Sequence, residues 1–248
     1  MRYYALGDST SIDLYPALDA GETDVAVALE RRVDAGAVAP IGAASLLARN
    51  DDARWPEFAG SDLASRDPHL ESVILASDGA SIGEVFGDQL PEVEPTDGDA
   101  IVTLTIGGND LLSAFSARPR AGLMERIVRD IAGGFDALLD AIAGTLPNAR
   151  IVLSTICDPS DRTGRIPGIL EELGPLPLQH LDTLNAHIRE HGRERPNTVV
   201  ADLYAHFLGH GASVEPRYRW YWKRSLIEPS AEGASEIRRV WLRALDGE

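Results

Sequence analysis

Short apolar runs alternate along the chain with longer segments in which apolar residues recur every three or four positions. A short, continuous apolar run bounded by turn residues is typical of a strand that is buried on both faces. We predict strands for the runs at residues 3–6, 72–76, 99–106, 150–155 and 198–203.

The segments between these runs carry the spacing of amphipathic helices. In the longest, residues 122–146, the side chains of Ile127, Ile131, Leu138 and Ile142 fall on one face, as in a helix that packs against a sheet. By the same criterion we predict a helical turn through His206 and helices at 23–34, 43–49, 81–90, 178–192 and 231–245.

Two segments interrupt this alternation. Residues 50–70 and 158–177 are broken by Pro and Gly, so both are predicted to be loops. Loops of this length are uncommon in compact domains unless they serve function. The second could form the wall of a cleft.

The alternation of strands and helices indicates a parallel sheet. Right-handed crossovers place helices on both of its faces, which gives a doubly wound, three-layer α/β domain. We expect residues 1–248 to form a single domain of this kind, because no linker or internal repeat divides the chain. In such a sheet the ligand-binding cleft lies at the C-terminal ends of the strands.

The balance of charge excludes some partners. The chain carries 39 acidic and 23 basic residues, a net charge of −16. This argues against nucleic acid and anionic membranes, because phosphate binding needs clusters of Lys and Arg. Lys223 is the only lysine, which fits a coding bias toward Arg and Ala better than the alternative, a high-salt habitat.

The single cysteine, Cys157, excludes an internal disulfide and a four-thiolate metal site, and we expect it to be buried and inert. No apolar run approaches the roughly 18 residues of a membrane span. The first residues lead directly into the first predicted strand, without a charged and apolar leader. We therefore expect a soluble, cytoplasmic protein.

Polar residues follow three of the predicted strands. Ser9 comes after residues 3–6, Gly79 after 72–76 and Asn109 after 99–106. A serine hydroxyl, the backbone amides of Ser9 and Gly79, and the Asn109 side chain would supply the nucleophile and the oxyanion donors of acyl transfer. In isolation, Ser9 could equally cap a helix and Asn109 could be a turn residue.

The motifs around these residues resemble those of the GDSL or SGNH hydrolases. Gly7-Asp8-Ser9 resembles the first block of that family, Gly79 within 77–83 the second, and Gly107-Gly108-Asn109-Asp110 the third. The resemblance implies a flavodoxin-like α/β/α sandwich, here with a five-stranded parallel sheet, and hydrolysis of a small-molecule ester. It also implies that Asp8 and Asp110 hold loop geometry.

The last block departs from the family pattern. The family ends in Asp-x-x-His-Pro, whereas this chain has Ser225 and Glu228 at the two acid-base positions, before Pro229. The usual Ser-His-Asp set is therefore absent, and we expect the segment to remain a loop.

Three alternatives remain for the base. A histidine on the preceding loop, His210 or else His206, could be the base, with Glu228 orienting it. Glu228 could itself be the base if burial by the aromatic residues 220–222 raises its pKa toward about 6–7. In the third alternative there is no base, and the protein is a catalytically silent binder of an acyl or carbohydrate ligand.

We therefore predict an ester hydrolase with Ser9, Gly79, Asn109, and either His210 or Glu228 at its site, and with no metal or organic cofactor. The i, i+4 pair His206 and His210 could ligate a metal, but lacks the Glu of a zincin motif and is flanked by Gly. The remaining histidines are expected to be solvated: His69, His180, His187 and His191. The acyl and alcohol groups and the oligomeric state are left open.

Overall fold

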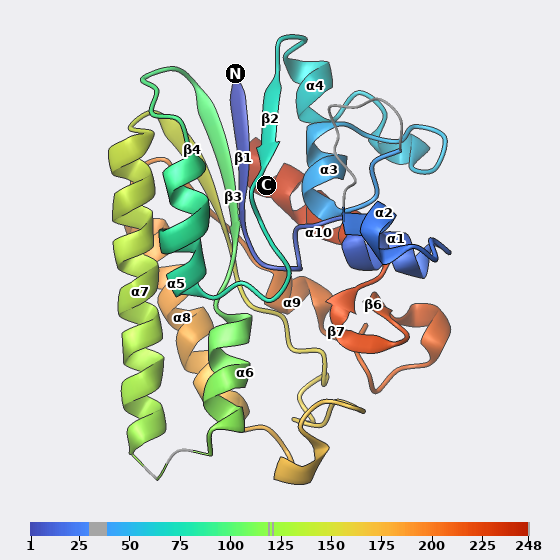
Figure 1. Ribbon diagram of the computed structural model, residues 1–248, viewed down its shortest axis with the longest axis vertical. Helices are drawn as coiled ribbons and strands as arrows, with labels where there is room; N and C mark the ends of the chain where they lie inside the picture. The colour runs from blue at the N-terminus through green and yellow to red at the C-terminus, as the bar shows by residue number, and fades with distance from the viewer. Residues whose placement is uncertain (30–38, 119, 121, 248) are drawn as a thin grey trace.

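Five parallel strands form the central sheet of the computed structural model, which describes residues 1–29, 39–118, 120 and 122–247 (Figure 1). Their spatial order is β2-β1-β3-β4-β5, the flavodoxin-like arrangement in which the order reverses beside the first strand. The predicted fold class is thus confirmed. The strands are β1 (Arg2–Gly7), β2 (Glu71–Ile74), β3 (Ala100–Thr105), β4 (Ala149–Ser154) and β5 (Thr198–Ala201).

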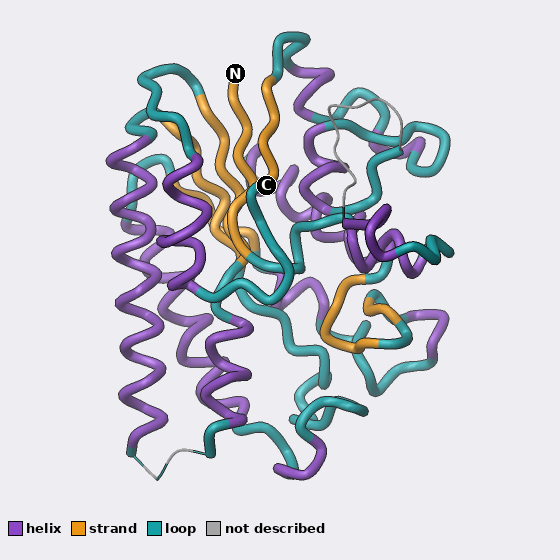
Figure 2. Tube along the Cα trace, in the orientation of Figure 1, coloured by secondary structure: helices purple, strands orange, loops and turns teal. Residues whose placement is uncertain are grey.

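Helices cover both faces of the sheet (Figures 1 and 2). On one face lie α5 (Ile82–Glu84), α6 (Gly108–Ser116), α7 (Leu123–Thr145) and α8 (Leu178–Glu194). On the other lie α1 (Leu14–Asp19), α2 (Val25–Leu29), α3 (Ala43–Ala48), α4 (Leu63–Arg66) and α10 (Ala231–Asp246), while α9 (Leu203–Phe207) follows β5.

The long amphipathic helices and all five strands agree with the sequence prediction to within a few residues. The predicted helix 81–90 is less regular: α5 passes into a turn of π-helix, Val85–Gln89, and a 3₁₀ turn, Leu90–Glu92. Of the predicted helix 23–34, α2 is described, whereas positions 30–34 lie outside the described residues. The segment 50–70 contains α4 and a 3₁₀ turn, Pro56–Phe58, rather than loop alone.

The prediction missed one helix, α6, and a two-stranded hairpin. The helix α6 starts directly after β3, where Gly107 has a φ of +97° and turns the chain. Strands β6 (Tyr221–Trp222) and β7 (Ser225–Pro229) pair antiparallel, so the last block is a short hairpin and not a loop. Glu228 lies on β7.

The terminal helix, α10, packs its buried side chains against the sheet and against the segment that follows α3. Trp241 of α10 is fully buried, and its indole donates to the Ser154 hydroxyl on β4 at 2.9 Å. Arg238 is also fully buried: its guanidinium lies 3.5 Å from the ring centre of Phe58 and donates to Asn50 at 2.6 Å. Burial lowers the pKa of Arg238 to about 10. The helix thereby fixes the segment after α3 to the sheet.

Gly7 sets the direction in which β1 leaves the sheet. Its φ is +122°, and a Cβ there would lie 1.9 Å from the carbonyl oxygen of Thr105 on β3. The buried amide of Gln89 pairs with the Gly7 backbone twice, accepting from its N–H and donating to its carbonyl, both at 2.8 Å. Asp8 N–H then donates to Thr105 at 2.8 Å. These contacts place the next residue, Ser9, at the end of the sheet.

We expect Gly7→Ala to lower the free energy of unfolding by at least about 2 kcal/mol, because the positive φ and the overlap with Thr105 both penalise a methyl group. Gly60→Ala is the matched control. Gly60 has a φ of +74° but no atom within 4 Å of an added Cβ, so its cost should be about 1 kcal/mol. Urea unfolding of both variants measures the difference, and equal costs would contradict the close approach.

Candidate active site

A cavity of about 120 Å³ lies at the C-terminal ends of the strands, where the topology predicts a ligand site. Ser9 follows β1, Asn109 lies in the first turn of α6, and Glu228 comes from β7. All three line the cavity, together with Asp8, Thr105, Ile156, Cys157, Asp158, Tyr221 and a set of Leu, Ile and Phe side chains.

Ser9 and Glu228 are the candidate nucleophile and candidate base of this cavity. Both residues line the cavity and are 8% exposed, and the Ser9 hydroxyl lies near enough to the Glu228 carboxyl group to lower its pKa. The second carboxyl oxygen, Oε2, is buried without a hydrogen-bond partner among the described residues. A hydroxyl beside a carboxylate with a free lone pair is the arrangement that transfers a proton.

The environment of Glu228 changes its acidity. The pKa of the Glu228 carboxyl group is raised to about 7, mainly by burial and to a smaller extent by the charges of Asp78 and Asp8, while the Ser9 hydroxyl acts in the opposite direction and lowers it. Tyr221 lines the cavity beside it and pairs across the hairpin with Pro229. Glu228 therefore has the pKa of an effective base near neutral pH.

Asn109 is held in place by the turn that follows β2. Its side-chain nitrogen donates to the carbonyl oxygen of Ala80 at 3.0 Å. An amide nitrogen carries two hydrogens, so one fixes the side chain and the other is available to an oxygen in the cavity. As a neutral donor, Asn109 keeps this role at any pH.

Two aspartates flank the pair. Burial raises the pKa of Asp8 to about 6, opposed by a hydrogen bond from the Thr10 N–H at 3.1 Å. Burial also raises the pKa of Asp110, which accepts from the Ile82 N–H at 3.2 Å. Among the described residues that line the cavity there is no Lys, Arg or His. Its electrostatic field therefore disfavours an anionic ligand.

The loop after β4 forms the apolar wall of the cavity. The buried side chain of Asn185 on α8 accepts from the Ile156 N–H and donates to the Ile156 carbonyl, both at 2.8 Å. Asp158, also buried, accepts from Ser160 N–H at 2.9 Å and from Arg162 N–H at 2.8 Å. The backbone that carries this wall is thus fixed by side chains rather than by the sheet.

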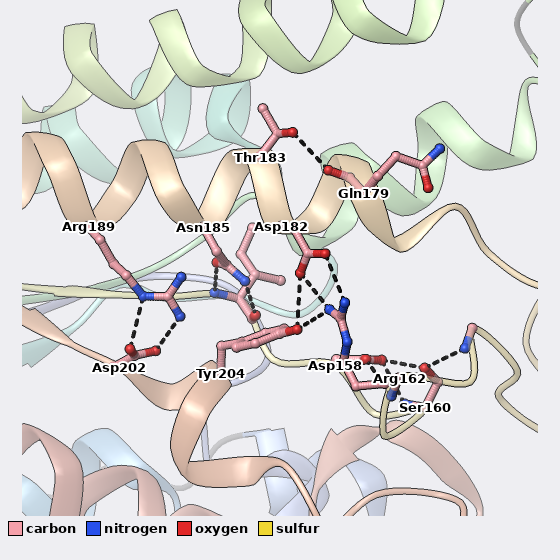
Figure 3. Close-up of polar contacts among 12 residues, drawn as sticks. Asp158, Ser160, Arg162, Gln179, Asp182, Thr183, Asn185, Arg189, Asp202 and Tyr204 are labelled. Atoms are coloured by element: carbon pink, nitrogen blue, oxygen red, sulfur yellow. Dashed lines mark hydrogen bonds and ion pairs between the residues drawn. The ribbon is translucent and has the colours of Figure 1, made fainter.

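Ion pairs tie the same loop to α8 and α9 (Figure 3). Arg162 forms a two-pronged ion pair with Asp182 at 2.6 and 3.1 Å, and Tyr204 donates to Asp182 at 3.0 Å. Arg189 pairs with Asp202 at 2.9 and 2.8 Å. Bidentate pairs restrict orientation as well as distance, so the wall has a defined position relative to Ser9.

The structure does not bring His210 to the cavity lining. Its Nδ1 donates to the carbonyl oxygen of Tyr218 at 2.8 Å, and its ring stacks on Trp220 at 3.5 Å. His206 instead pairs through Nε2 with Glu236 at 2.8 Å. These two histidines therefore point to different partners and form no common metal site among the described residues.

Gly79 also lies outside the residues that line the cavity. It has a φ of +74° in the turn after β2, and the next residue, Ala80, holds Asn109. The sequence analysis missed Gln89 and Asn185, whose amides fix the strand ends. Both lie at helical spacing from apolar residues; Asn185, for example, comes four residues after Leu181 and three before Ile188. A polar amide within an apolar stripe is the signal that would have found them.

Comparison with known proteins identifies one family. A family profile described as "GDSL-like Lipase/Acylhydrolase family" matches residues 5–235. No curated protein matches the chain at a significant level.

Solved structures share the fold at low sequence identity. An extracellular lipase from Streptomyces rimosus is 19% identical with a TM-score of 0.60, covering 100% of this chain and 99% of that one. An acetyl xylan esterase from Geobacillus stearothermophilus is 17% identical with a TM-score of 0.62, covering 98% and 94%. A phospholipase A1 from Streptomyces albidoflavus is 18% identical with a TM-score of 0.58, covering 99% and 98%. Within the described residues, none of the helices has the length and apolar character needed to cross a bilayer.

Glu228 should make folding stability depend on pH. Because its pKa is raised from 4.5 to about 7, its contribution is fully present below pH 4.5 and is lost as the pH rises through 7. A pKa displaced this far corresponds to about 3 kcal/mol. Glu228→Gln carries no charge, so relative to wild type it should gain about that much stability between pH 4 and pH 8. Urea unfolding of both proteins tests this, and a pH-independent difference would rule out the buried carboxylate.

Proposed function

The chain belongs to the GDSL-like lipase/acylhydrolase family, and on that premise we propose that it hydrolyses neutral carboxylic esters with Ser9 as nucleophile and Glu228 as general base. The observation that carries the proposal is that Ser9 and the buried carboxyl group of Glu228 line the same cavity, where the pKa of Glu228 is raised to about 7. In this proposal a carboxylate takes the place of the imidazole.

In the first half of the reaction, Ser9 Oγ attacks the ester carbonyl while Glu228 accepts its proton. The tetrahedral intermediate then collapses, the alcohol leaves with the proton from Glu228, and an acyl-Ser9 remains. In the second half, Glu228 accepts a proton from water, which attacks the acyl group and releases the acid. Ser9 recovers its proton from Glu228.

The oxyanion of the intermediate is stabilised by neutral donors. The free hydrogen of the Asn109 side chain is one, since the other is used by Ala80. One such donor contributes about 2.7–4 kcal/mol to transition-state stabilisation. Gly79, whose amide we expected to be a second donor, does not line the cavity, so our proposal assigns the main role to Asn109.

The substrate is a neutral ester with a short acyl chain. The cavity holds carboxyl groups and no cation among its described lining residues, so an anionic group near Ser9 would be repelled. The rest of its lining is mostly apolar, which suits a hydrocarbon group. Its volume of about 120 Å³ compares with the 150 Å³ engineered cavity that accepts benzene, and this limits the acyl group to a few carbons.

Ser9→Ala and Glu228→Gln should each lower kcat for nitrophenyl acetate or butyrate by about 10²–10⁴-fold, because each removes a proton-transfer partner. Wild-type kcat/KM should rise with pH through about 7, where Glu228 loses its proton. The test is steady-state hydrolysis from pH 5 to pH 9.

Glu232→Gln is the matched control for the carboxylate. Glu232 lies in the first turn of α10 and does not line the cavity, so this variant should keep wild-type rates. Full activity in Glu228→Gln would exclude Glu228 as base. If no ester is hydrolysed in a Ser9-dependent way, the alternative of a silent binding protein takes precedence.

His210→Ala should retain kcat within a few-fold, because its ring is engaged with Tyr218 and Trp220 away from the cavity lining. The loss of stacking should lower the melting temperature only. Rates are normalised to the folded fraction seen by circular dichroism, with Ser9→Ala as the inactive reference. A folded His210→Ala enzyme slowed 100-fold or more would restore histidine as the base.

A further inference from the structure

Three potential metal ligands converge where α7 packs on α8, outside the cavity lining. Asp136 lies on α7, and His187 and His191 lie one turn apart on α8. The two imidazole rings stack with their centres 3.8 Å apart. The sequence predicts that both histidines are solvated, but in the structure each is only partly exposed.

The ligand atoms are arranged around a common point. Asp136 Oδ2 lies 3.3 Å from His187 Nε2, and Asp136 Oδ1 lies 2.8 Å from His191 Nδ1. One ligand atom from each residue falls within 4.8 Å of the other two. Tetrahedral bonds of about 2.0–2.1 Å separate ligand atoms by about 3.3 Å, so a shift of the side chains by about 1.5 Å or less brings the three atoms to the spacing that one ion requires.

The protein leaves two of these atoms without a hydrogen bond. His187 Nε2 and Asp136 Oδ1 are buried and have no hydrogen-bond partner among the described residues; although His191 lies near Oδ1, the contact lacks the alignment of a hydrogen bond. Buried polar atoms are rarely left unpaired in native structures. A bound cation would satisfy both.

The surrounding charges leave room for that cation. Arg195 is the nearest cationic side chain seen at the cluster, with its Nη2 3.9 Å from Asp136 Oδ1. Its guanidinium is engaged elsewhere, pairing with Asp140 and donating to the backbone carbonyl of Asp136 at 3.3 Å. Arg195 is therefore held beside the three ligands rather than between them.

We propose that Asp136, His187 and His191 form a binding site for a divalent transition-metal ion of the zinc class, which links α7 to α8. Two imidazoles and one carboxylate favour zinc, cobalt or nickel, whereas calcium and magnesium prefer oxygen donors alone. Water from the open side completes the coordination. The ion stabilises the packing of the two helices and takes no part in ester hydrolysis, since none of the three residues lines the cavity.

The test uses the full chain with any polyhistidine tag removed and with metal stripped by a chelator. Calorimetric titration with zinc sulfate should show one ion bound per chain at micromolar or tighter affinity. Cobalt should produce the visible absorption bands of a tetrahedral site. Zinc should also raise the melting temperature by several degrees, because the ion binds only the folded state.

Asp136→Asn, His187→Gln and His191→Gln should each weaken zinc binding by at least about 100-fold and remove the thermal shift. His69→Gln is the matched control, since His69 is exposed and outside the cluster. Circular dichroism of the metal-free variants shows whether they fold, and the two His variants serve as independent replicates. The proposal would be overturned if wild type and all three variants bound zinc with equal affinity. It would also be overturned if wild type bound no zinc at concentrations up to about 1 mM, since a dissociation constant above that value corresponds to a very weak site.

Discussion

Backbone groups at the ends of parallel strands lose their ladder partners, and the rest of this structure depends on how they are satisfied. Two buried amides solve the problem: Gln89 pairs with both polar groups of Gly7, and Asn185 pairs with both polar groups of Ile156. Each side-chain amide makes the two hydrogen bonds that a neighbouring strand would make, at a point where the sheet has no such strand. The chain can then leave β1 and β4 in a defined direction, and the segments that follow these two strands line the cavity.

A carboxylate as the proposed base imposes its own requirements on the cavity. Imidazole has a useful pKa in water, but a glutamate acquires one only if its charged form is destabilised. Enclosure by the β6–β7 hairpin provides this for Glu228, and the absence of cations among the described lining residues preserves it. The hairpin that raises the pKa of Glu228 by burying it also reduces the space for substrate. One structural element therefore sets both the strength of the base and the size of the substrate.

The sequence predicted the parts of the molecule that obey local rules. The strands were visible as apolar runs, and Ser9 and Asn109 were singled out because they follow predicted strands; in the structure both line the cavity. The helix α6 was missed because Gly107 and Gly108 suggest a turn, whereas here they begin a helix. Which of His210 and Glu228 reaches the cavity depends on how the residues after β5 fold back, and in the structure Trp220 and Tyr221 pack edge-on against Phe207.

Ser9 follows the first strand of the chain and Glu228 lies on the last, and the two residues line one cavity. The N–H of Ala231, at the start of α10, reaches the same region by donating to Asp19 on α1 at 3.2 Å. During synthesis the N-terminal segment emerges first and must wait for the C-terminal one, as in other topologies dominated by contacts between distant residues. In the mechanism that we propose, a chain whose β6–β7 hairpin has not yet docked would hold Ser9 without its base, so folding of the hairpin would be the step that assembles the site.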